Sequence, residues 1–157
     1  MTNQGTVLTV LSGLAAAGAG VHAVTHWSLT ATLFLFGVGT MTAFVAEAVV
    51  ISRGWLKHHV TPAILGVPLY ILCGWVVTLY LVITIALSIT SEWAAVVLAA
   101  SLATGYDMIV DHQGVRVGLW SYTGGPPGPS LGAVPWWNFA GWFVITASVA
   151  SPTIMIV

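Results

Sequence analysis

The amino-acid sequence predicts an all-α fold, a polytopic bundle of about five transmembrane helices. Of its 157 residues, 58% are hydrophobic and only 4% are charged, whereas a soluble domain carries roughly a quarter charged residues to keep its surface solvated. The chain also contains several apolar runs as long as the ~20 residues that a helix needs to cross a bilayer core. We therefore interpret residues 1–157 as a single membrane domain without a soluble part.

Five apolar runs are predicted as spans, in chain order. The first follows the segment MTNQG, which lacks the positive charges of a secretory signal, so we expect this run to be retained as a helix. The single cysteine, Cys73, lies inside the third run, so an intramolecular disulfide is impossible. The runs cover residues 6–24, 28–51, 63–89, 92–110 and 135–157.

Three basic residues predict how the bundle is oriented. Arg53 and Lys57 follow the second run, and Arg116 follows the fourth. Five spans place both connections on the same side, which the positive-inside rule makes the cytoplasmic side. We expect a multi-pass protein of the cell membrane, with its N-terminus in the cytoplasm and its C-terminus outside. The formal net charge of −1 argues against nucleic acid as a partner, and membrane lipid is the expected one.

A proline and a Gly-Trp pair recur with the same spacing in the third and fifth runs. After Pro68, a Gly-Trp pair begins six residues later and ends at Trp75. After Pro135, the same pair begins at the identical distance and ends at Trp142. Proline fits the first turn of a helix, where its missing N–H would be unsatisfied anyway. Each proline is therefore predicted to begin a helix that re-enters the membrane from the cytoplasmic side.

We interpret this recurrence as an internal repeat, with units of approximately residues 28–89 and 92–157. Each unit would consist of a helix running toward the cytoplasm, a polar loop and a proline-started helix running outward. Repeats in the same orientation are related by an axis along the membrane normal and tend to build a site at their interface. The alternative is a chance recurrence, because proline and Gly-Trp pairs are common near membrane interfaces.

The carboxyl groups within the spans are the main candidates for chemistry. Asp107 and Asp111 are four residues apart and share one face of a helix, and Glu47 ends the second run at a comparable depth. Such residues are costly in a membrane and normally face the bundle interior or a wet cavity. A carboxyl group kept neutral by apolar surroundings is also a suitable general acid. All three are predicted to point at one site, unless Asp111 lies at the interface and pairs with Arg116 while Asp107 bonds a neighbouring helix.

The histidines do not predict a metal site. His58 and His59 are adjacent, would diverge on a helix and are expected at the membrane interface. His22 and His26 have the i, i+4 spacing that could bind a metal, but they flank the outer end of the first run. No spacing of His, Cys and carboxylate residues resembles a zinc site.

Most of the eight tryptophans are expected to form interfacial belts. Only Trp75 and Trp142, from the recurring motif, lie deeper in the spans. Aromatic faces stabilise cations through the ring quadrupole, so these two would suit a site that passes through carbocation character. The belt residues are Trp27 and Trp93 on the outer side and Trp55, Trp120, Trp136 and Trp137 on the inner side.

The chain resembles, most specifically in its second half, a family of integral-membrane carotenoid biosynthesis proteins, which includes carotenoid hydratases and bisanhydrobacterioruberin hydratase. The likeness extends over roughly residues 40–146. In the first half it is carried by Glu47, Gly66-Val-Pro68 and Trp75. In the second half it is carried by Asp107-Met-Ile-Val-Asp111, Gly118-Leu-Trp120, Val134-Pro135, Asn138 and Gly141-Trp142.

The resemblance implies the addition of water to a terminal isoprenoid double bond of a long carotenoid, which yields a tertiary alcohol. In this interpretation Asp107 donates the proton, while Asp111 or Glu47 orients the water. No metal or redox cofactor is needed for this reaction. The expected substrate-binding residues are Trp75, Trp120, Asn138, Trp142 and Arg116.

A non-catalytic role is the alternative: a membrane protein that binds a carotenoid or another isoprenoid, or a small subunit of a larger membrane complex. The short chain favours it, as does His112, which replaces the proline typical of the family. The small-residue run over residues 13–20 would suit packing against a partner or a second copy. A small transporter built on parallel repeats is a further alternative, although no charge pair is predicted in mid-membrane.

Overall fold

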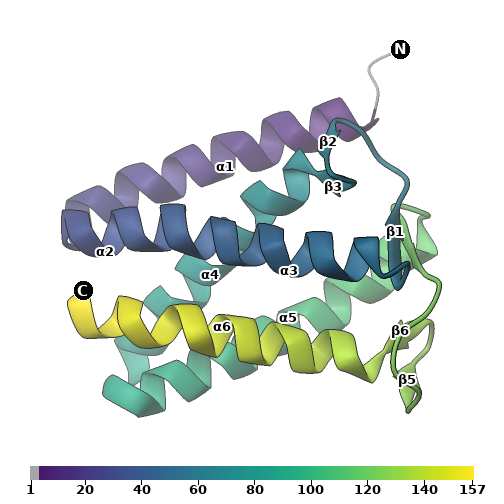
Figure 1. Ribbon diagram of the computed structural model, residues 1–157. Helices are drawn as coiled ribbons and strands as arrows, with labels where there is room; N and C mark the ends of the chain where they lie inside the picture. The colour runs from purple at the N-terminus through teal and green to yellow at the C-terminus, as the bar shows by residue number, and fades with distance from the viewer. Residues whose placement is uncertain (1–3) are drawn as a thin grey trace.

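The computed structural model describes residues 4–157, and its helices lie side by side in one bundle with short strands at one end (Figure 1). Five helical stretches are long and apolar enough to cross a membrane, so the predicted all-α, multi-pass bundle is confirmed. The helices are α1 (Gln4–His26), α2 (Leu29–Leu33), the π-helical segment η1 (Phe34–Gly39), α3 (Thr40–Ser52), α4 (Leu69–Ile89), α5 (Glu92–Arg116) and α6 (Trp136–Ile156).

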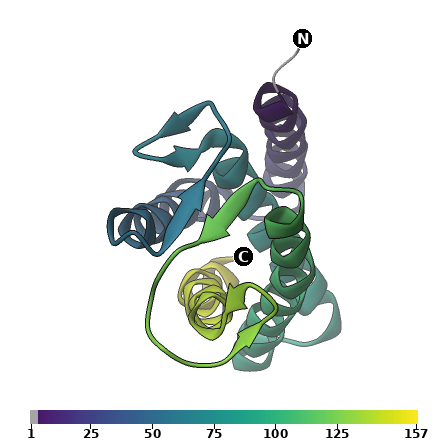
Figure 2. The same cartoon turned by 90° about the vertical axis from the view of Figure 1, so that its right-hand side faces the viewer.

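Six short strands form three two-stranded ribbons at the end of the bundle that Figure 2 faces. We call it the hairpin end. Strand β2 pairs with β3 and β5 pairs with β6, so that each forms a hairpin, whereas β1 pairs with β4 across the two halves of the chain. The strands are β1 (Leu56–His58), β2 (Ala63–Ile64), β3 (Val67–Pro68), β4 (Trp120–Tyr122), β5 (Ser130–Leu131) and β6 (Val134–Pro135).

The spans differ from the predicted runs mainly at the hairpin end. The third helix begins at Leu69, because the preceding residues turn back on themselves as β2 and β3. Pro68 is the extended N-cap residue of α4, with φ −66° and ψ 142°, and Pro135 is the N-cap of α6. Each proline therefore lies just before its helix and not within the first turn. Helix α5 extends to Arg116, about 1.7 turns beyond the predicted run.

The same order of elements occurs twice: helix, strand, hairpin, helix. Helices α3 and α5 both end in a glycine with positive φ, 70° at Gly54 and 76° at Gly118. In both, the N–H of the residue after the glycine bonds the carbonyl five residues earlier, from Trp55 to Val50 and from Leu119 to Gly114. This is the Schellman motif, and a residue with a Cβ in place of the glycine would be strained at this positive φ. In both halves the motif leads from the helix toward the strand that follows it, from α3 to β1 and from α5 to β4.

The core is built on α4, which packs against α1, α3, α5 and α6. Helix α5 meets α4 and α6 through a row of small buried residues at four-residue spacing, Ala95, Ala99 and Ala103. Such residues let helix backbones approach closely in a membrane. Continued by the same spacing, this row reaches Asp107 and Asp111. The helix face that packs the core therefore delivers the two carboxyl groups to the interior at the hairpin end.

Candidate functional site

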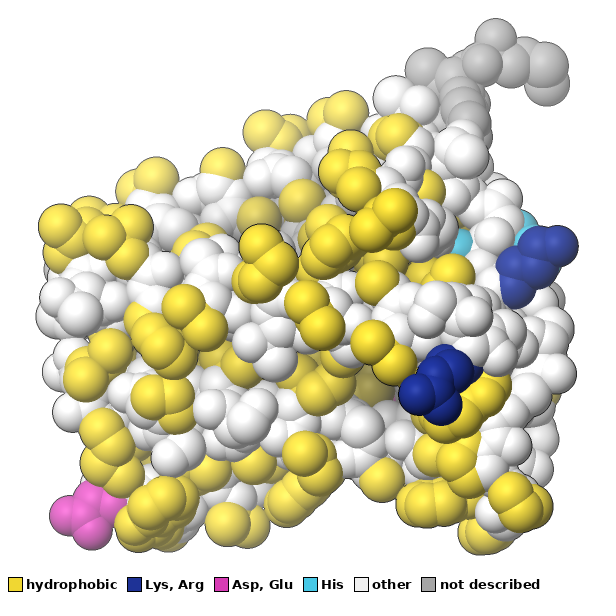
Figure 3. All heavy atoms as spheres, viewed as in Figure 1, with side chains coloured by type: hydrophobic (Ala, Val, Ile, Leu, Met, Phe, Trp, Pro, Cys, Tyr) yellow, Lys and Arg dark blue, Asp and Glu magenta, His cyan; other side chains and the backbone are white. Residues whose placement is uncertain are grey.

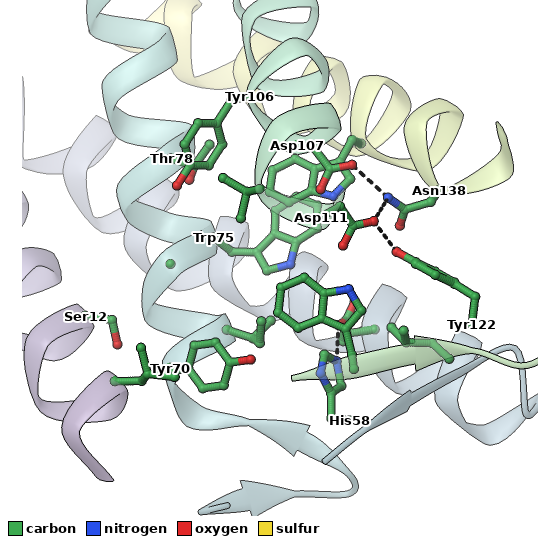
Figure 4. A pocket seen from close by; sticks show the side chains of 18 of the residues that line it. Ser12, His58, Tyr70, Trp75, Thr78, Tyr106, Asp107, Asp111, Tyr122 and Asn138 are labelled. Carbon is green, nitrogen blue, oxygen red and sulfur yellow. Dashed lines mark hydrogen bonds and ion pairs between the residues drawn. The ribbon is translucent and has the colours of Figure 1, made fainter. Parts of the chain in front are cut away.

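A cavity of about 270 Å³ lies between the helices at the hairpin end (Figure 4). The three carboxyl side chains singled out in the spans, Glu47, Asp107 and Asp111, all line it. Asp107 and Asp111 are 4% and 5% exposed. Glu47 comes from α3, whereas both aspartates come from α5. These two helices end in the same Schellman motif, so the repeated architecture brings the acidic residues together.

An asparagine joins the two aspartates. Asn138, in the first turn of α6, donates from Nδ2 to Asp107 Oδ2 at 2.7 Å and to Asp111 Oδ2 at 2.8 Å. Asp111 also accepts a hydrogen bond from the hydroxyl of Tyr122 on β4. Asp111 thus has two donors and Asp107 has one. The alternative in which Asp111 pairs with Arg116 is wrong, since the two partners of Asp111 are the neutral side chains of Tyr122 and Asn138.

The third carboxylate pairs with a histidine. His58 Nε2 lies 2.7 Å from Glu47 Oε1, with side chains 3% and 14% exposed. This is the only ion pair among residues 4–157. His58 lies on the strand Leu56–His58 and not on a helix, and its side chain is buried. Alternate residues of a strand face the same side, so His58 points inward with Leu56, while Lys57 points out.

The two acidic pairs occupy equivalent places in the two halves. His58 follows Glu47 by 11 residues, and Tyr122 follows Asp111 by 11 residues. In the ribbon of β1 and β4, Lys57 pairs with Ser121 at the centre. On either side of this pair, Leu56 pairs with Tyr122 and His58 pairs with Trp120, so the ribbon is symmetric about its centre. Equivalent backbone positions therefore carry an imidazole in one half and a phenol in the other, and each bonds the carboxyl group of its own half.

Tyr122 remains a hydrogen-bond donor over the ordinary pH range. Burial raises its pKa far above the usual value for tyrosine, and the negative charge of Asp111 raises it further. Both effects disfavour the phenolate. The hydroxyl therefore stays protonated and donates to Asp111, which fixes the orientation of that carboxyl group.

Three residues that line the cavity each carry a buried polar atom with no hydrogen-bond partner of normal geometry within the described chain. The atoms are His58 Nδ1, Tyr70 OH and Trp120 Nε1. Buried polar atoms are nearly always bonded, to protein or to ordered water. Three such unpaired groups on residues around one cavity are unusual in a folded protein. Sequence reasoning missed Tyr70, Tyr122 and His58, and only the alternation of Leu56, Lys57 and His58 could have indicated the last.

The aromatic side chains also meet at the cavity. The rings of Trp75 and Trp142 stack with centroids 3.6 Å apart and an interplanar angle of 8°, so the two recurring Gly-Trp pairs contact each other. Each ring covers one face of the other. Trp120 is not an interfacial belt residue, because it is 6% exposed and lies edge-on to His58 at 5.8 Å between ring centroids.

Two predicted groups lie elsewhere. Arg116 is exposed at the end of α5 and does not line the cavity, and its expected role in substrate binding stays a prediction. His22 and His26 stack at 3.9 Å near the end of α1 that lies away from the hairpins. Among the described residues, no three His, Cys, Asp or Glu side chains are grouped to hold a metal ion.

The family relationship rests on the whole described chain. No curated protein and no solved structure matches the sequence. A family model described as "Carotenoid biosynthesis protein" matches residues 4–157, which includes all five spans and every residue of the cavity. The chain is therefore a multi-pass membrane protein that belongs to the carotenoid biosynthesis protein family and acts in that pathway.

Proposed function

We propose that the protein is a carotenoid hydratase, which adds water to a terminal isoprenoid double bond and forms a tertiary alcohol. The observation that carries the proposal is the pair of buried aspartates bridged by Asn138, in a cavity that also holds the Glu47–His58 pair. Hydration of an unactivated alkene needs an acid to protonate carbon and a base to accept a proton from water. The aspartate pair offers the acid, and the Glu47–His58 pair offers the base.

Asp107 is the proposed acid. Two carboxylates that share one amide donor in an apolar cavity repel each other. The pair is therefore more stable when it holds one proton between them. Asp111 accepts from both Tyr122 and Asn138, which suits the charged member of the pair. Asp107 accepts only from Asn138, so we assign it the proton that is transferred to the substrate.

His58 is the proposed base, oriented by Glu47. A carboxylate can only accept a hydrogen bond, so the 2.7 Å contact assigns the donated proton to His58 Nε2. The lone pair of neutral imidazole is then on Nδ1, the atom without a protein partner. A histidine held by a carboxylate in this way can take a proton from a bound water. Glu47 thus orients water through His58.

The tryptophans would stabilise the cationic intermediate. Protonation of the less substituted carbon of a terminal double bond leaves a tertiary cation, and an aromatic face stabilises such a charge. Trp75 and Trp142 line the cavity, but each has one face covered by the other ring. Only an outer face of the stack is left for the substrate.

The steps conserve atoms and charge. The alkene takes a proton from Asp107 and becomes a tertiary cation, and the oxygen of water then forms a bond to that carbon. His58 Nδ1 accepts the proton released by the water, and this proton returns to Asp107 through solvent. One water is added in total, and nothing is oxidised or reduced.

The experiment is expression in cells that accumulate an acyclic carotenoid, with mass analysis of the extracted pigments. The wild type should yield a pigment heavier by one water. Asp107→Asn should lower this product about 100-fold or more, because an amide cannot donate an acidic proton. The matched control is Glu92→Gln, which alters an exposed carboxyl group at the other end of the same helix and should leave the product unchanged.

Full product formation by Asp107→Asn would contradict the assignment of the acid. Unchanged pigment in cells that hold wild-type protein in their membranes would contradict hydration itself. Unconverted carotenoid that copurifies with the protein would then favour the binding role.

A further inference from the structure

A second, apolar hollow extends from the cavity along the helices. It has a volume of about 370 Å³ and is lined by residues of α1, α4 and α5. It shares Ser12, Gly74, Thr78 and Tyr106 with the cavity that holds the aspartates, so the two spaces are parts of one continuous groove. Figure 4 shows three of these shared residues, Ser12, Thr78 and Tyr106, on the side of the cavity away from Asn138.

The groove is open on the flank of the bundle. Along its length it is bordered by Leu11, Leu81, Ile85 and Tyr106, which are 61%, 50%, 46% and 49% exposed. This stretch of the chain spans the membrane, so the opening faces acyl chains. From Gly74 to Ile85 the groove follows α4 for roughly 16 Å, given a rise of 1.5 Å per residue.

The open end and the closed end differ in chemistry. The outer groove is lined by apolar side chains and by the hydroxyl residues Ser12, Thr78 and Tyr106, without a charged group. The inner cavity contains Asp107 and Asp111. A charged headgroup drawn through the outer part would find no charged group to replace its lost hydration. A long hydrocarbon can instead enter end first and place its terminus among the polar groups. Because the chain belongs to a carotenoid biosynthesis family, a linear isoprenoid is the hydrocarbon that fits.

We infer that the groove between α1, α4 and α5 admits the linear chain of an isoprenoid sideways from the bilayer, with one chain end at the aspartates and the remainder in lipid. This inference rests on the proposed function for the chemistry at that end. Gly74 keeps the groove continuous, because it lies where the two parts join and a Cβ there meets no atom within 4 Å. A side chain at Gly74 can therefore leave the backbone without a clash at Cβ and extend into the passage.

The chain offers a matched control. Gly141 is the equivalent glycine of the second Gly-Trp pair, and a Cβ there also meets nothing within 4 Å, but it lines neither part of the groove. Gly74→Leu and Gly141→Leu thus place the same side chain at corresponding positions, one in the groove and one outside it. A second pair on α1, Ala15→Phe and Ala17→Phe, compares a groove residue with an exposed residue outside it.

The test uses the full chain, purified in mild detergent from cells that accumulate lycopene, a linear carotenoid. Pigment is extracted and counted per protein, and each variant is first checked for a monodisperse elution profile. Wild type, Gly141→Leu and Ala17→Phe should retain lycopene or its hydrated product. Gly74→Leu should retain roughly tenfold less, the cost of overpacking a site by about 1.4 kcal/mol, and Ala15→Phe should fall in the same direction.

Equal pigment in Gly74→Leu and Gly141→Leu would overturn the groove assignment. So would wild-type protein that returns with phospholipid and no carotenoid. Two outcomes separate this inference from the proposed function. If the wild type retains only unconverted lycopene and Gly74→Leu loses it, the groove is supported and hydration fails. If a hydrated product forms equally in Gly74→Leu, hydration is supported and the groove assignment fails.

Discussion

Two residues at equivalent positions, His58 and Tyr122, differ in what they can do to a proton. Each bonds the carboxyl group that precedes it by 11 residues. The phenol of Tyr122 can only hold and orient Asp111 near neutral pH, because its pKa is raised by burial and by that carboxylate. The imidazole of His58 can accept a proton. A symmetric backbone thus supplies one orienting group and one base.

Replacement of His58 tests the role of the base. In His58→Gln, the amide can still donate to Glu47, but it has no basic nitrogen. We expect the hydrated product to fall roughly 100-fold, with little change in the thermal unfolding temperature in detergent. His59→Gln is the control, because His59 is exposed and its side chain contacts Ser121 on the neighbouring strand and not Glu47.

Equal product levels in His58→Gln and His59→Gln would show that His58 is not the base. The role of accepting a proton from water would then be assigned to Asp111. A large fall in unfolding temperature for His58→Gln, with no specific loss of product per folded protein, would make the Glu47–His58 pair structural.

Residues four apart on a long helix could be assigned to a common site from sequence, whereas residues on short strands could not. The prediction that Asp107 and Asp111 share a face required only helical geometry, which a long apolar run makes secure. His58 lies on a strand of three residues, too short to show a period. Its inward direction is set by pairing with β4, a partner distant in the sequence.

At the scale of elements, the end of α5 is fitted closely to strand β4. The indole of Trp120 lies directly over Gly114, where an added Cβ would come within 2.0 Å of Trp120 Cζ2. Gly114 is therefore required for the close approach of the helix to the ring, and Trp120 can form part of the cavity wall only because this position has no side chain.

Gly114→Ala should consequently destabilise the protein by about 1 to 3 kcal/mol, the usual cost of overpacking, and should displace Trp120 from the cavity. Gly105→Ala is the control on the same helix, because a Cβ there meets nothing within 4 Å. That change should be neutral or stabilising by up to about 1 kcal/mol, as expected when glycine is replaced within a helix.

Thermal unfolding in detergent, followed by circular dichroism, measures both variants. Equal unfolding temperatures for Gly114→Ala and Gly105→Ala would show that Trp120 moves aside at little cost. The product level should fall in Gly114→Ala alone, since only this change disturbs the wall of the cavity.

The helices were predictable and the ribbons were not, for a physical reason. Hydropathy identifies a span from its own residues, since a helix satisfies its backbone hydrogen bonds internally. The pairing of β1 with β4 joins Leu56 to Tyr122 and His58 to Trp120, so it depends on two loops far apart in the chain. The third apolar run was consequently predicted to begin at residue 63, where β2 and β3 form a hairpin.

At the scale of the whole molecule, the exposed charges are separated between the two ends of the bundle. Arg53 is the C-cap residue of α3, Lys57 lies on β1 and Arg116 is the last residue of α5, all at the hairpin end. Glu92 begins α5 at the other end. Figure 3 shows this separation, with dark blue side chains toward the hairpins and a magenta side chain at the opposite corner. The cavity lies at the basic end.

This separation leads us to propose that the hairpin end is cytoplasmic, with the N-terminus inside and the C-terminus outside. Positive residues in short loops are retained in the cytoplasm during insertion, and all three basic residues agree. A C-terminal alkaline phosphatase fusion should therefore be active and a C-terminal green fluorescent protein fusion dark, with the reverse for fusions in the loop after β4. A fluorescent C-terminal fusion would contradict this orientation, and would place the aspartates where water and protons reach them from outside the cell instead of from the cytoplasm.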